Sequence, residues 1–426
     1  MINNDKLYVW HPYASAVDKN PLYVVEKAKG VHIYLKTGEK LIDGMSSWWC
    51  VINGYNHPKL NKAIKDQLEK FSHVMFGGFT HKPATDLAKK INEITPPSLQ
   101  KVFFSDSGSV SVEVAMKFAI QYWYSQEKFQ KKKFLTVKNG YHGDTIGTMS
   151  VSDPKNGMHS IFNKSLLKQI YVAKPEDVRL YNKKTSKSLQ QMEKTLKELN
   201  SNIAGVIIEP ILQGAGGMRI YHSDYLVQLR KLCNKYNVLL ILDEIATGFG
   251  RTGELFGFNH ANIVPDILCL GKSLTGGYMS LAATVVSKGI AKSISKKEPG
   301  IFMHGPTYMA NPLACSVALA NINLLFSYDW KKNVKSIEKT LNDNLEKISK
   351  NNAVKDYRVI GAVGILEMKK RVDVGSIQKK FVKHGIWLRP FSNFIYVMPP
   401  YIILKKDLRF LMKQLEVVIN IEYKNL

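Results

Sequence analysis

Cysteine is scarce in this sequence, and long apolar runs are missing from it. The four cysteines show neither the spacing of a disulfide framework nor a CxxC pair; they are Cys50, Cys233, Cys269 and Cys315. This usage is typical of proteins in a reducing cytosol. No apolar run approaches the ~18 residues that a bilayer-spanning helix needs, and the first residues lack the basic and apolar regions of a secretory signal. We therefore expect a cytoplasmic protein that makes no use of a membrane.

Arginine is also scarce, although basic residues as a whole are abundant. The chain has 60 basic residues against 35 acidic ones, a formal net charge of +25, yet only 8 of the 60 are arginine. Nucleic-acid surfaces favour arginine forks for bases and phosphates, whereas these lysines are spread along the chain with modest clusters at Lys131–Lys133 and Lys183–Lys197. A lysine-biased composition with solvated faces therefore explains the charge better than nucleic-acid binding does. Each retained arginine is expected where a planar, bidentate contact is needed.

Several common cofactor signatures are absent as well. The sequence has no HExxH motif and no Cys/His cluster, so it predicts no metal site. The glycines of Gln213–Gly217 do not continue into GxGxxG, because Arg219 occupies the last position. Gly271-Lys272-Ser273 lacks the first glycine of a Walker A loop, because Asp266 stands there. Neither a dinucleotide site nor a P-loop is predicted.

Short apolar runs alternate with longer helical segments through most of the chain. Segments 109–124 and 223–236 have helical patterns, and runs typical of buried strands stand between such segments: Lys101–Phe104, Phe134–Val137, Ala204–Ile208, Val238–Leu242 and Ile267–Leu270. This alternation predicts an α/β fold with a mostly parallel sheet covered by helices on both faces.

The length of 426 residues predicts two domains, or a large domain with a smaller one attached. The first 50 residues have hairpin character around His32–Asp43 and no core of their own. From about residue 330 onward, short strands, helices and lysine-rich surface indicate a smaller α+β unit. We therefore expect a large domain over residues 51–328 and a small domain formed by residues 1–50 and 329–426.

Polar or glycine-rich residues directly follow several of the predicted strands. Ligands of parallel sheets bind beyond the carboxyl ends of the strands. The segments that reach this edge are Ser105–Ser109, Glu209-Pro210, Asp243-Glu244 and Gly271-Lys272. Their convergence predicts a site at the carboxyl edge of the sheet.

Asp243 and Lys272 indicate which ligand this site takes. A carboxylate directly after an apolar strand is costly to bury unless it meets a cation, and a protonated pyridine nitrogen is such a cation. Lys272 follows the next strand, 29 residues later, which fits one strand–helix–strand step. A lysine amine in this position suits a Schiff base with pyridoxal phosphate (PLP). Taken singly, Asp243 is equally typical of a helix cap, and Lys272 of a surface cation.

Two further segments fit the same ligand. Asp106–Ser109 opens the helix 109–124, and small residues at a helix N-terminus leave backbone N–H groups available for a phosphate. Tyr141 stands between glycines in Gly140–Gly143, where an aromatic ring can lie flat on a planar cofactor. Taken alone, the first segment is as typical of a simple N-cap, and the second of a tight turn with a half-buried tyrosine.

Motifs along almost the whole chain carry a resemblance to a known family. They are Trp10–Tyr13, Asp43–Trp49, Ser72–Gly78, Asp106–Ser109, Gly140–Thr145, Glu209–Arg219, Asp243–Gly253, Gly271–Tyr278, His304–Thr307, Leu388–Phe391 and Ile395–Pro400. The chain resembles the class III (ω-type) aminotransferases of PLP fold type I. The double Trp, the His-Val-Met-Phe-Gly-Gly run and the Arg-Pro-Phe tail are specific to the branch of the family that serves biotin synthesis. Two departures are conservative: Ala310 stands where Gly is usual in the family, and Ser280 where Thr is common.

The resemblance implies a fold and a set of cofactor contacts. The fold is a large domain with a mostly parallel sheet plus a smaller α+β domain built from both termini. Lys272 would form the Schiff base and carry protons, Asp243 would pair with the pyridine nitrogen, and Tyr141 would stack on the ring. The remaining implied cofactor contacts are Gly108 and Ser109 at the phosphate, Thr307 from a partner subunit, and Glu209 near the 3-oxygen of the ring.

The resemblance also implies the substrate contacts, which are Tyr13, Trp48, Trp49, Tyr141, Arg251, Lys272, Gly305, Arg389 and Tyr396. Arg389 would bind a carboxylate, and the scarcity of arginine agrees with that role. Adjacent residues on a strand point to opposite faces, so one residue of the Trp pair is expected to be structural. Of the two, Trp49 is favoured as the ligand contact.

The implied activity is a ping-pong transamination within a homodimer that shares its active sites. The α-amino group of S-adenosylmethionine would pass to PLP and then to 8-amino-7-oxononanoate, giving 7,8-diaminononanoate. Lysine as the donor, another ω-aminotransferase activity, and a basic nucleic-acid-binding protein that retained an inactive enzyme fold are the alternatives. The intact set of Lys272, Asp243 and Thr307 argues against the last of these.

Overall fold

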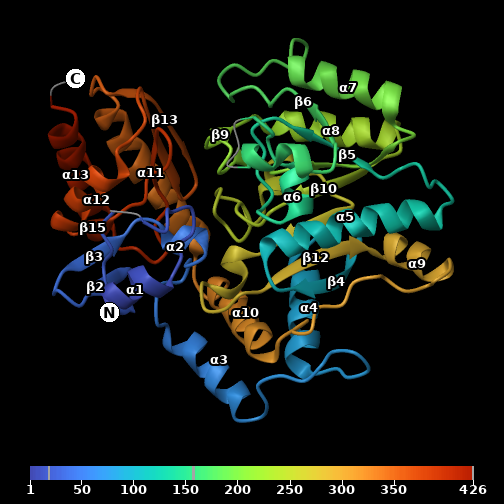
Figure 1. Ribbon diagram of the computed structural model, residues 1–426, viewed down its shortest axis with the longest axis horizontal. Coiled ribbons are helices and arrows are strands. Elements are labelled where there is room, and N and C mark those ends of the chain that lie inside the picture. Colours follow the sequence, from blue (N-terminus) through green and yellow to red (C-terminus); the bar gives the residue numbers. More distant parts are fainter. Residues whose placement is uncertain (18–19, 156–158, 425–426) are drawn as a thin grey trace. The chain divides into compact units, whose positions relative to one another are not determined.

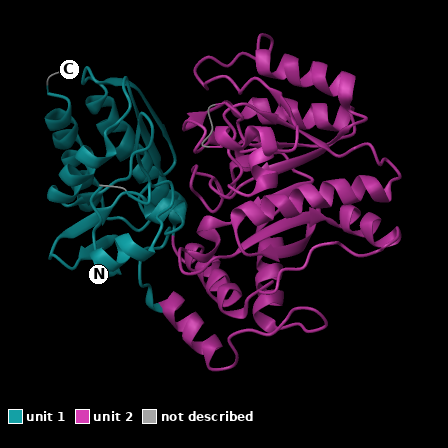
Figure 2. Cartoon of the chain, in the orientation of Figure 1, with its two compact units in different colours: residues 1–58, 329–426 teal, residues 59–328 magenta. Residues whose placement is uncertain are grey.

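The computed structural model describes residues 1–17, 20–155 and 159–424, and the chain forms two compact units. Unit 1 consists of residues 1–58 and 329–426, and unit 2 of residues 59–328 (Figure 2). Both chain termini therefore belong to the same unit. The first division falls after Pro58 rather than after residue 50, and it coincides with the start of helix α3 (Pro58–Leu68).

Unit 2 is built on a seven-stranded sheet. Its strands, in spatial order, are β4 (Leu99–Ser105), β12 (Ala282–Ser287), β11 (Ile267–Leu270), β10 (Leu239–Asp243), β7 (Ile203–Ile208), β5 (Lys133–Val137) and β6 (Ile170–Val172). Only β12 runs antiparallel to its neighbours, and the pairs from β11 to β6 are parallel. The mostly parallel sheet expected from the sequence is confirmed, with strand ends shifted by one or two residues.

Helices cover the sheet because its central strands are apolar on both sides. The side chain of Ile241 packs in one core cluster with residues of α5 (Gly108–Ser125), and Leu240 and Leu242, which alternate with it, are also fully buried. Figure 1 shows α5 lying across the sheet. The other helices of unit 2 are α3, α4 (Lys82–Ile94), α6 (Ile146–Val151), α7 (Lys187–Leu199), α8 (Ser223–Lys235), α9 (Lys288–Lys296) and α10 (Pro312–Leu325). Short 3-10 turns stand at Ser160–Ser165, Gly257–Ala261 and Lys272–Thr275, and a small hairpin pairs β8 (Leu212–Gln213) with β9 (Arg219–Ile220).

Unit 1 contains two smaller sheets. One has the order β1 (Val25–Lys29), β2 (His32–Leu35), β3 (Lys40–Asp43) and β15 (Ile386–Trp387), and the other has β13 (Val354–Ile360), β14 (Val363–Met368) and β16 (Phe394–Val397). The parallel pairing of β15 with β3 joins the C-terminal segment to the N-terminal hairpin. The helices of this unit are α1 (Ile2–Tyr8), α2 (Ser46–Trp49), α11 (Trp330–Ile348), α12 (Val374–Lys383) and α13 (Lys405–Glu422).

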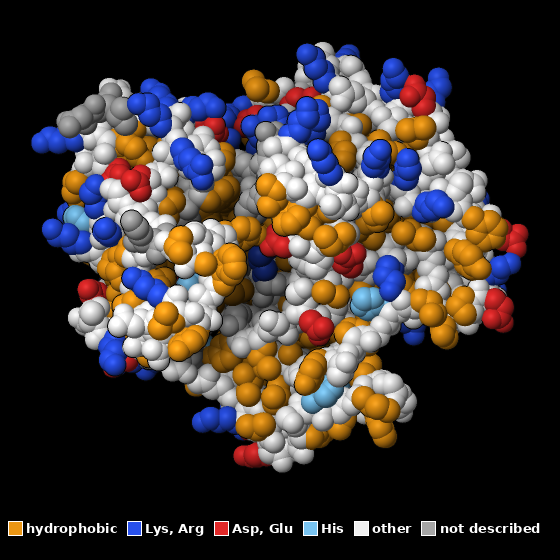
Figure 3. Space-filling model, in the orientation of Figure 1, with side chains coloured by type: hydrophobic (Ala, Val, Ile, Leu, Met, Phe, Trp, Pro, Cys, Tyr) orange, Lys and Arg blue, Asp and Glu red, His pale blue; other side chains and the backbone are white. Residues whose placement is uncertain are grey.

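The described residues have a surface of mixed charge and four free thiols. Lys and Arg side chains are scattered over much of the face in Figure 3, with other side chains between them. Among the described residues, no helix is long and apolar enough to cross a bilayer, and no group of three or more metal-ligating side chains gathers. All four cysteines have free thiols.

Candidate active site

Asp243 ends strand β10 as a buried carboxylate with partners on both oxygens. Asp243 is the last residue of a strand whose five residues are all buried. Oδ1 accepts the backbone N–H of Ile245 at 3.1 Å, and Oδ2 lies 2.8 Å from Nδ1 of His142. Within the described part of the chain, the other ring nitrogen of His142, Nε2, is buried without a hydrogen-bond partner. The His142 imidazole therefore fixes the orientation of the Asp243 carboxylate through Nδ1, and its Nε2 atom makes no hydrogen bond to a described residue.

Glu209 is a second buried carboxyl group, placed directly after the neighbouring strand β7. Its two oxygens accept the backbone N–H groups of Tyr141, at 2.9 Å, and Gly214, at 2.8 Å. Burial raises the pKa of Glu209 to about 7, His142 acts to lower it, and Asp243 acts to raise it. Two acidic groups thus share one buried region with the imidazole of His142. A cationic ligand atom would be stabilised between them.

The segment of Lys272 reaches the same edge of the sheet as Asp243 because β11 pairs with β10. Asp243 is opposite Cys269 in the register of β10 and β11, and Lys272 comes three residues after Cys269. A Cβ built on Gly271 would lie 3.4 Å from Cγ2 of Ile245, and one on Gly108 would lie 2.9 Å from the same atom. The segment of Lys272, the N-terminus of α5 and the end of β10 therefore meet at Ile245. Lys272 is half-buried, and its φ of 39° lies in a region that non-glycine residues rarely adopt and that occurs often at functional sites.

Tyr141 has a fixed ring at the edge of this group. Its hydroxyl donates to Oδ1 of Asp144 at 3.0 Å, and the same oxygen lies 2.7 Å from Nε2 of His159. The imidazole of His159 stacks on the Tyr141 ring with centroids 5.7 Å apart and planes inclined by 26°. Since Glu209 accepts the backbone N–H of Tyr141, both the main chain and the ring are held.

The N-terminus of α5 is close-packed against the loop that carries Tyr141. Ser107 caps the helix by accepting the N–H of Val110 at 3.3 Å. The hydroxyl of Ser109 accepts the N–H of Asp144 at 3.2 Å. A Cβ on Gly143, where φ is +127°, would lie 2.1 Å from Oγ of Ser109, so only glycine fits there. Gly108 and Ser109 thus form the first turn of an 18-residue helix whose positive dipole end favours an anion.

Three other residues predicted for this site also belong to unit 2. Arg251 is fully buried. Gly305 is exposed, and no heavy atom lies within 4 Å of a Cβ built on it. Thr307 is exposed, and its carbonyl oxygen lies 3.1 Å from Nε2 of His73. Their contacts with substrate or cofactor stay predictions.

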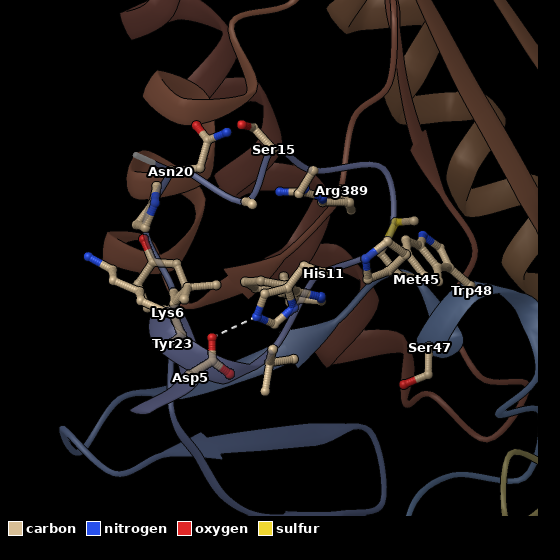
Figure 4. Close-up of a pocket in the computed structure, with 17 residues that line it drawn as sticks. Asp5, Lys6, His11, Ser15, Asn20, Tyr23, Met45, Ser47, Trp48 and Arg389 are labelled. Carbon is tan, nitrogen blue, oxygen red and sulfur yellow. Dashed lines mark hydrogen bonds and ion pairs between the residues drawn. The ribbon is translucent and has the colours of Figure 1, made fainter. Parts of the chain in front are cut away.

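Unit 1 contains a cavity of about 390 Å³ that brings together two residues predicted to contact substrate, Trp48 and Arg389 (Figure 4). Arg389, Trp48, Met45 and Trp387 line it, together with the hydrogen-bonded pair of His11 and Asp5, whose Nε2 and Oδ2 atoms are 2.7 Å apart. A cationic fork beside a flat aromatic surface is suited to a ligand that has a carboxylate and an extended or cationic body.

The two adjacent tryptophans do not lie on a strand, so that expectation is wrong. They belong to the short segment α2, whose backbone is left-handed at Ser47 and Trp48. Trp48 is 47% exposed and lines the cavity, whereas Trp49 is only 7% exposed. Trp48 thus faces the cavity and Trp49 is packed inside the unit, and which of the two contacts substrate stays a prediction.

Tyr13 and Tyr396, the other aromatic residues predicted for substrate, differ in exposure. Tyr13 is 61% exposed, and its neighbours Pro12 and Ala14 line the cavity. Tyr396 is 5% exposed on β16. Burial raises the pKa of Tyr396, and the nearby charge of Arg389 acts to lower it, so the two side chains are within electrostatic range.

Comparison with known proteins decides the family. The model of the family described as aminotransferase class-III matches residues 13–419. The chain belongs to the class III aminotransferases. It is 52% identical over 417 residues, covering 98% of this chain and 97% of the relative, to a protein of Buchnera aphidicola subsp. Acyrthosiphon pisum (strain APS) named adenosylmethionine-8-amino-7-oxononanoate aminotransferase.

Two solved structures show the fold of this class III aminotransferase. One is adenosylmethionine-8-amino-7-oxononanoate aminotransferase from Methanocaldococcus jannaschii DSM 2661, with a TM-score of 0.92, 33% identity and 98% of each chain covered. The other is an amine transaminase from an uncultivated Pseudomonas species in its PLP-bound, internal aldimine form. Its TM-score is 0.90 and its identity 29%, with 97% of this chain and 98% of that chain covered. The fold-type I architecture expected from the sequence is confirmed.

The buried groups of this class III aminotransferase fit PLP, the cofactor of the family. The buried carboxyl groups of Asp243 and Glu209 suit a protonated pyridine nitrogen. Lys272 offers an amine at the adjacent strand end, and the first turn of α5 offers backbone N–H groups to a phosphate. The donor set and the close packing at Gly108 and Gly143 therefore suit a flat ligand that has both an anionic phosphate and a protonated ring nitrogen.

Sequence reasoning missed three residues of this site: His142, Asp144 and His159. The first two lie in the Gly140–Thr145 motif, which was a usable signal, but nothing in their types or spacing assigned them to Asp243 and Tyr141. His159 lies outside every motif, and only the tertiary structure brings it onto the Tyr141 ring.

Proposed function

We propose that this aminotransferase transfers the α-amino group of S-adenosylmethionine to 8-amino-7-oxononanoate, a step of biotin synthesis that yields 7,8-diaminononanoate. The observation that carries the proposal is the 52% identity, over nearly the whole of both chains, to a relative named for that activity. The cavity of unit 1 supports it, because Arg389 suits a carboxylate and the face of Trp48 suits both a sulfonium and a long chain.

The residues of unit 2 have separate tasks in this reaction. Bound PLP supplies an electron-withdrawing ring that stabilises negative charge at the carbon losing its proton, and it carries the amino group between the two substrates in turn. The Nζ atom of Lys272 removes and returns the proton at that carbon. Asp243 keeps a proton on the pyridine nitrogen, and His142 holds Asp243 in place. The Tyr141 ring stacks on the cofactor and is itself held by Asp144.

The remaining predicted contacts complete the proposal. Gly108 and Ser109 would bind the phosphate, and Glu209 would lie near the 3-oxygen of the ring. The proposed substrate contacts are those implied by the family resemblance, which are Tyr13, Trp48, Trp49, Tyr141, Arg251, Lys272, Gly305, Arg389 and Tyr396. Because Trp49 is buried in unit 1, its part is to support Trp48 from behind.

The active enzyme is proposed to be a cytoplasmic homodimer in which Thr307 reaches the phosphate of the partner's cofactor. Two segments of unit 2 meet where the His73 ring packs on the Tyr308 ring, with centroids 4.7 Å apart. Both segments expose large apolar side chains, which are Val74, Met75, Phe79, Ile301, Met303 and Tyr308. An apolar surface of this kind next to Thr307 supports contact with a second copy of the chain.

A donor screen tests the proposed activity. Purified protein loaded with PLP and given 8-amino-7-oxononanoate is expected to form 7,8-diaminononanoate with S-adenosylmethionine as donor. The measurement is product formation with S-adenosylmethionine, lysine, ornithine and 4-aminobutyrate in parallel. Product with lysine alone would assign a different donor, and turnover of ornithine or 4-aminobutyrate with a 2-oxo acid as acceptor, in place of 8-amino-7-oxononanoate, would assign another ω-aminotransferase activity.

Replacing Arg389 with alanine is expected to weaken substrate binding through loss of the carboxylate fork. A charged hydrogen-bonded pair of this kind contributes about 2–4 kcal/mol, so KM should rise roughly 30-fold or more. Arg389→Lys keeps the charge but not the fork, and it should give an intermediate KM. The matched control is Arg409→Ala, an exposed arginine of α13 in the same unit. An unchanged KM for both substrates in Arg389→Ala would contradict the role.

A further inference from the structure

Residues Ser46–Trp49 form a left-handed backbone turn, which is rare for residues other than glycine. The φ angles are 47° at Ser46, 43° at Ser47, 58° at Trp48 and 83° at Trp49. L-amino acids avoid this region because Cβ crowds the carbonyl oxygen, and they enter it singly rather than in runs. Four such residues in succession persist only where surrounding contacts overrule the local preference. We call this segment the left-handed turn.

A chain of three side chains holds the middle of the left-handed turn. Asp43 is fully buried, and its Oδ1 accepts the N–H of Met45 at 2.7 Å. Its Oδ2 accepts the hydroxyl of Tyr55 at 2.6 Å, and Oγ of Ser47 lies 2.6 Å from the same hydroxyl. Since the one phenolic proton goes to Asp43, the Ser47 hydroxyl donates to Tyr55. Burial and the charge of Asp43 raise the pKa of Tyr55, so the phenol keeps that proton.

A second anchor fixes the start of the left-handed turn. The hydroxyl of Ser46 is fully buried and donates to the carbonyl oxygen of Met398 at 2.7 Å. The backbone N–H of Met398 donates in return to the carbonyl oxygen of Gly44 at 2.6 Å. The turn is thereby tied to the segment that follows β16, far along the chain in the same unit.

The left-handed turn decides which tryptophan meets the cavity. Figure 4 shows Met45 and Trp48 on the side of the cavity that holds Arg389, whereas the Ser47 hydroxyl points away from Arg389. We propose that Asp43 and Tyr55 are positioning residues, which act through Ser47 to keep Trp48 facing the substrate cavity. The inference rests on the proposed function, which provides the substrates that Trp48 would contact.

Tyr55→Phe tests the proposal, because it keeps the ring and removes both hydrogen bonds. KM for both S-adenosylmethionine and 8-amino-7-oxononanoate should rise roughly tenfold, with kcat changed by less than about twofold. PLP content should stay unchanged, because the proposed cofactor contacts lie in unit 2. In a Trp48→Ala background, Tyr55→Phe should raise KM no further, since it acts through Trp48. The matched control is Tyr34→Phe on β2 of the same unit, which should leave KM unchanged.

A second readout does not depend on activity. The near-UV circular dichroism that is lost in Trp48→Phe should also be lost in Tyr55→Phe, measured without substrate. If the parent protein fails to use the two substrates, the proposed function is wrong, while this spectral result still decides the positioning role. Ser47→Ala removes the hydrogen bond to Tyr55 at an exposed residue, so it is the variant to measure if Tyr55→Phe folds poorly. Parental KM and an unchanged spectrum in folded Tyr55→Phe or Ser47→Ala, or additive effects with Trp48→Ala, would overturn the proposal.

Discussion

Replacing Lys272 with alanine is expected to abolish transamination, with kcat reduced on the order of 10³-fold or more. Lys272 follows the carboxyl end of β11 directly beyond Gly271, and β11 pairs with the strand that ends at Asp243. Loss of the Lys272 amine removes both the covalent attachment of the cofactor and the group that moves the proton. The measurement is steady-state turnover together with the visible absorbance of the protein after incubation with PLP.

Lys288→Ala is the matched control for this prediction. Lys288 also directly follows a strand of the central sheet, β12, and is exposed. Because β12 runs antiparallel to β11, its carboxyl end lies at the opposite edge of the sheet from Lys272. Lys288→Ala should retain parental activity and absorbance. Full activity in Lys272→Ala would refute the assignment of the catalytic lysine.

The parts of the site that the sequence predicted lie at strand ends. Strands such as Leu239–Asp243 are apolar over their whole length, so the polar residue that ends each of them is conspicuous. The parallel pairing of β10 with β11 then brings Asp243 and the Lys272 segment to the same edge. Local pattern and the rule for parallel sheets were sufficient here, because the positions depend on hydrogen bonds between neighbouring strands.

The parts that the sequence did not predict depend on contacts between distant segments. The Trp48–Trp49 pair was expected on a strand, where adjacent side chains point to opposite faces. The hydroxyl of Ser46 instead bonds to Met398, 352 residues away, and that contact has no trace in the local pattern. His159 likewise reaches Tyr141 only through the fold. The roles of Arg251, Gly305 and Thr307 stay predictions from family resemblance.

Replacing Asp243 with asparagine is expected to reduce kcat on the order of 100-fold or more, since it removes the buried charge that balances a cationic ring nitrogen. Asparagine has nearly the same shape, so its Oδ1 can still accept the N–H of Ile245. The bond to Nδ1 of His142 cannot survive unchanged, because an amide N–H₂ facing that nitrogen requires the other tautomer. The measurement is kcat for each half-reaction, with PLP content determined on the same sample.

Asp266→Asn provides a comparison that separates catalysis from folding. Asp266 also accepts a backbone N–H of β10, that of Leu240, and it pairs with Arg230 at 2.7 Å. Its loss should lower stability while leaving kcat of the folded protein close to the parental value. If Asp243→Asn merely lowered stability in the same way and kept its kcat, the carboxylate would be a structural acid rather than the partner of the cofactor. A large loss of kcat with full PLP content would instead mean that the charge of Asp243 acts on the bound ring. We expect this second result, because the buried Asp243 carboxylate is held by His142 and lies within electrostatic range of Glu209.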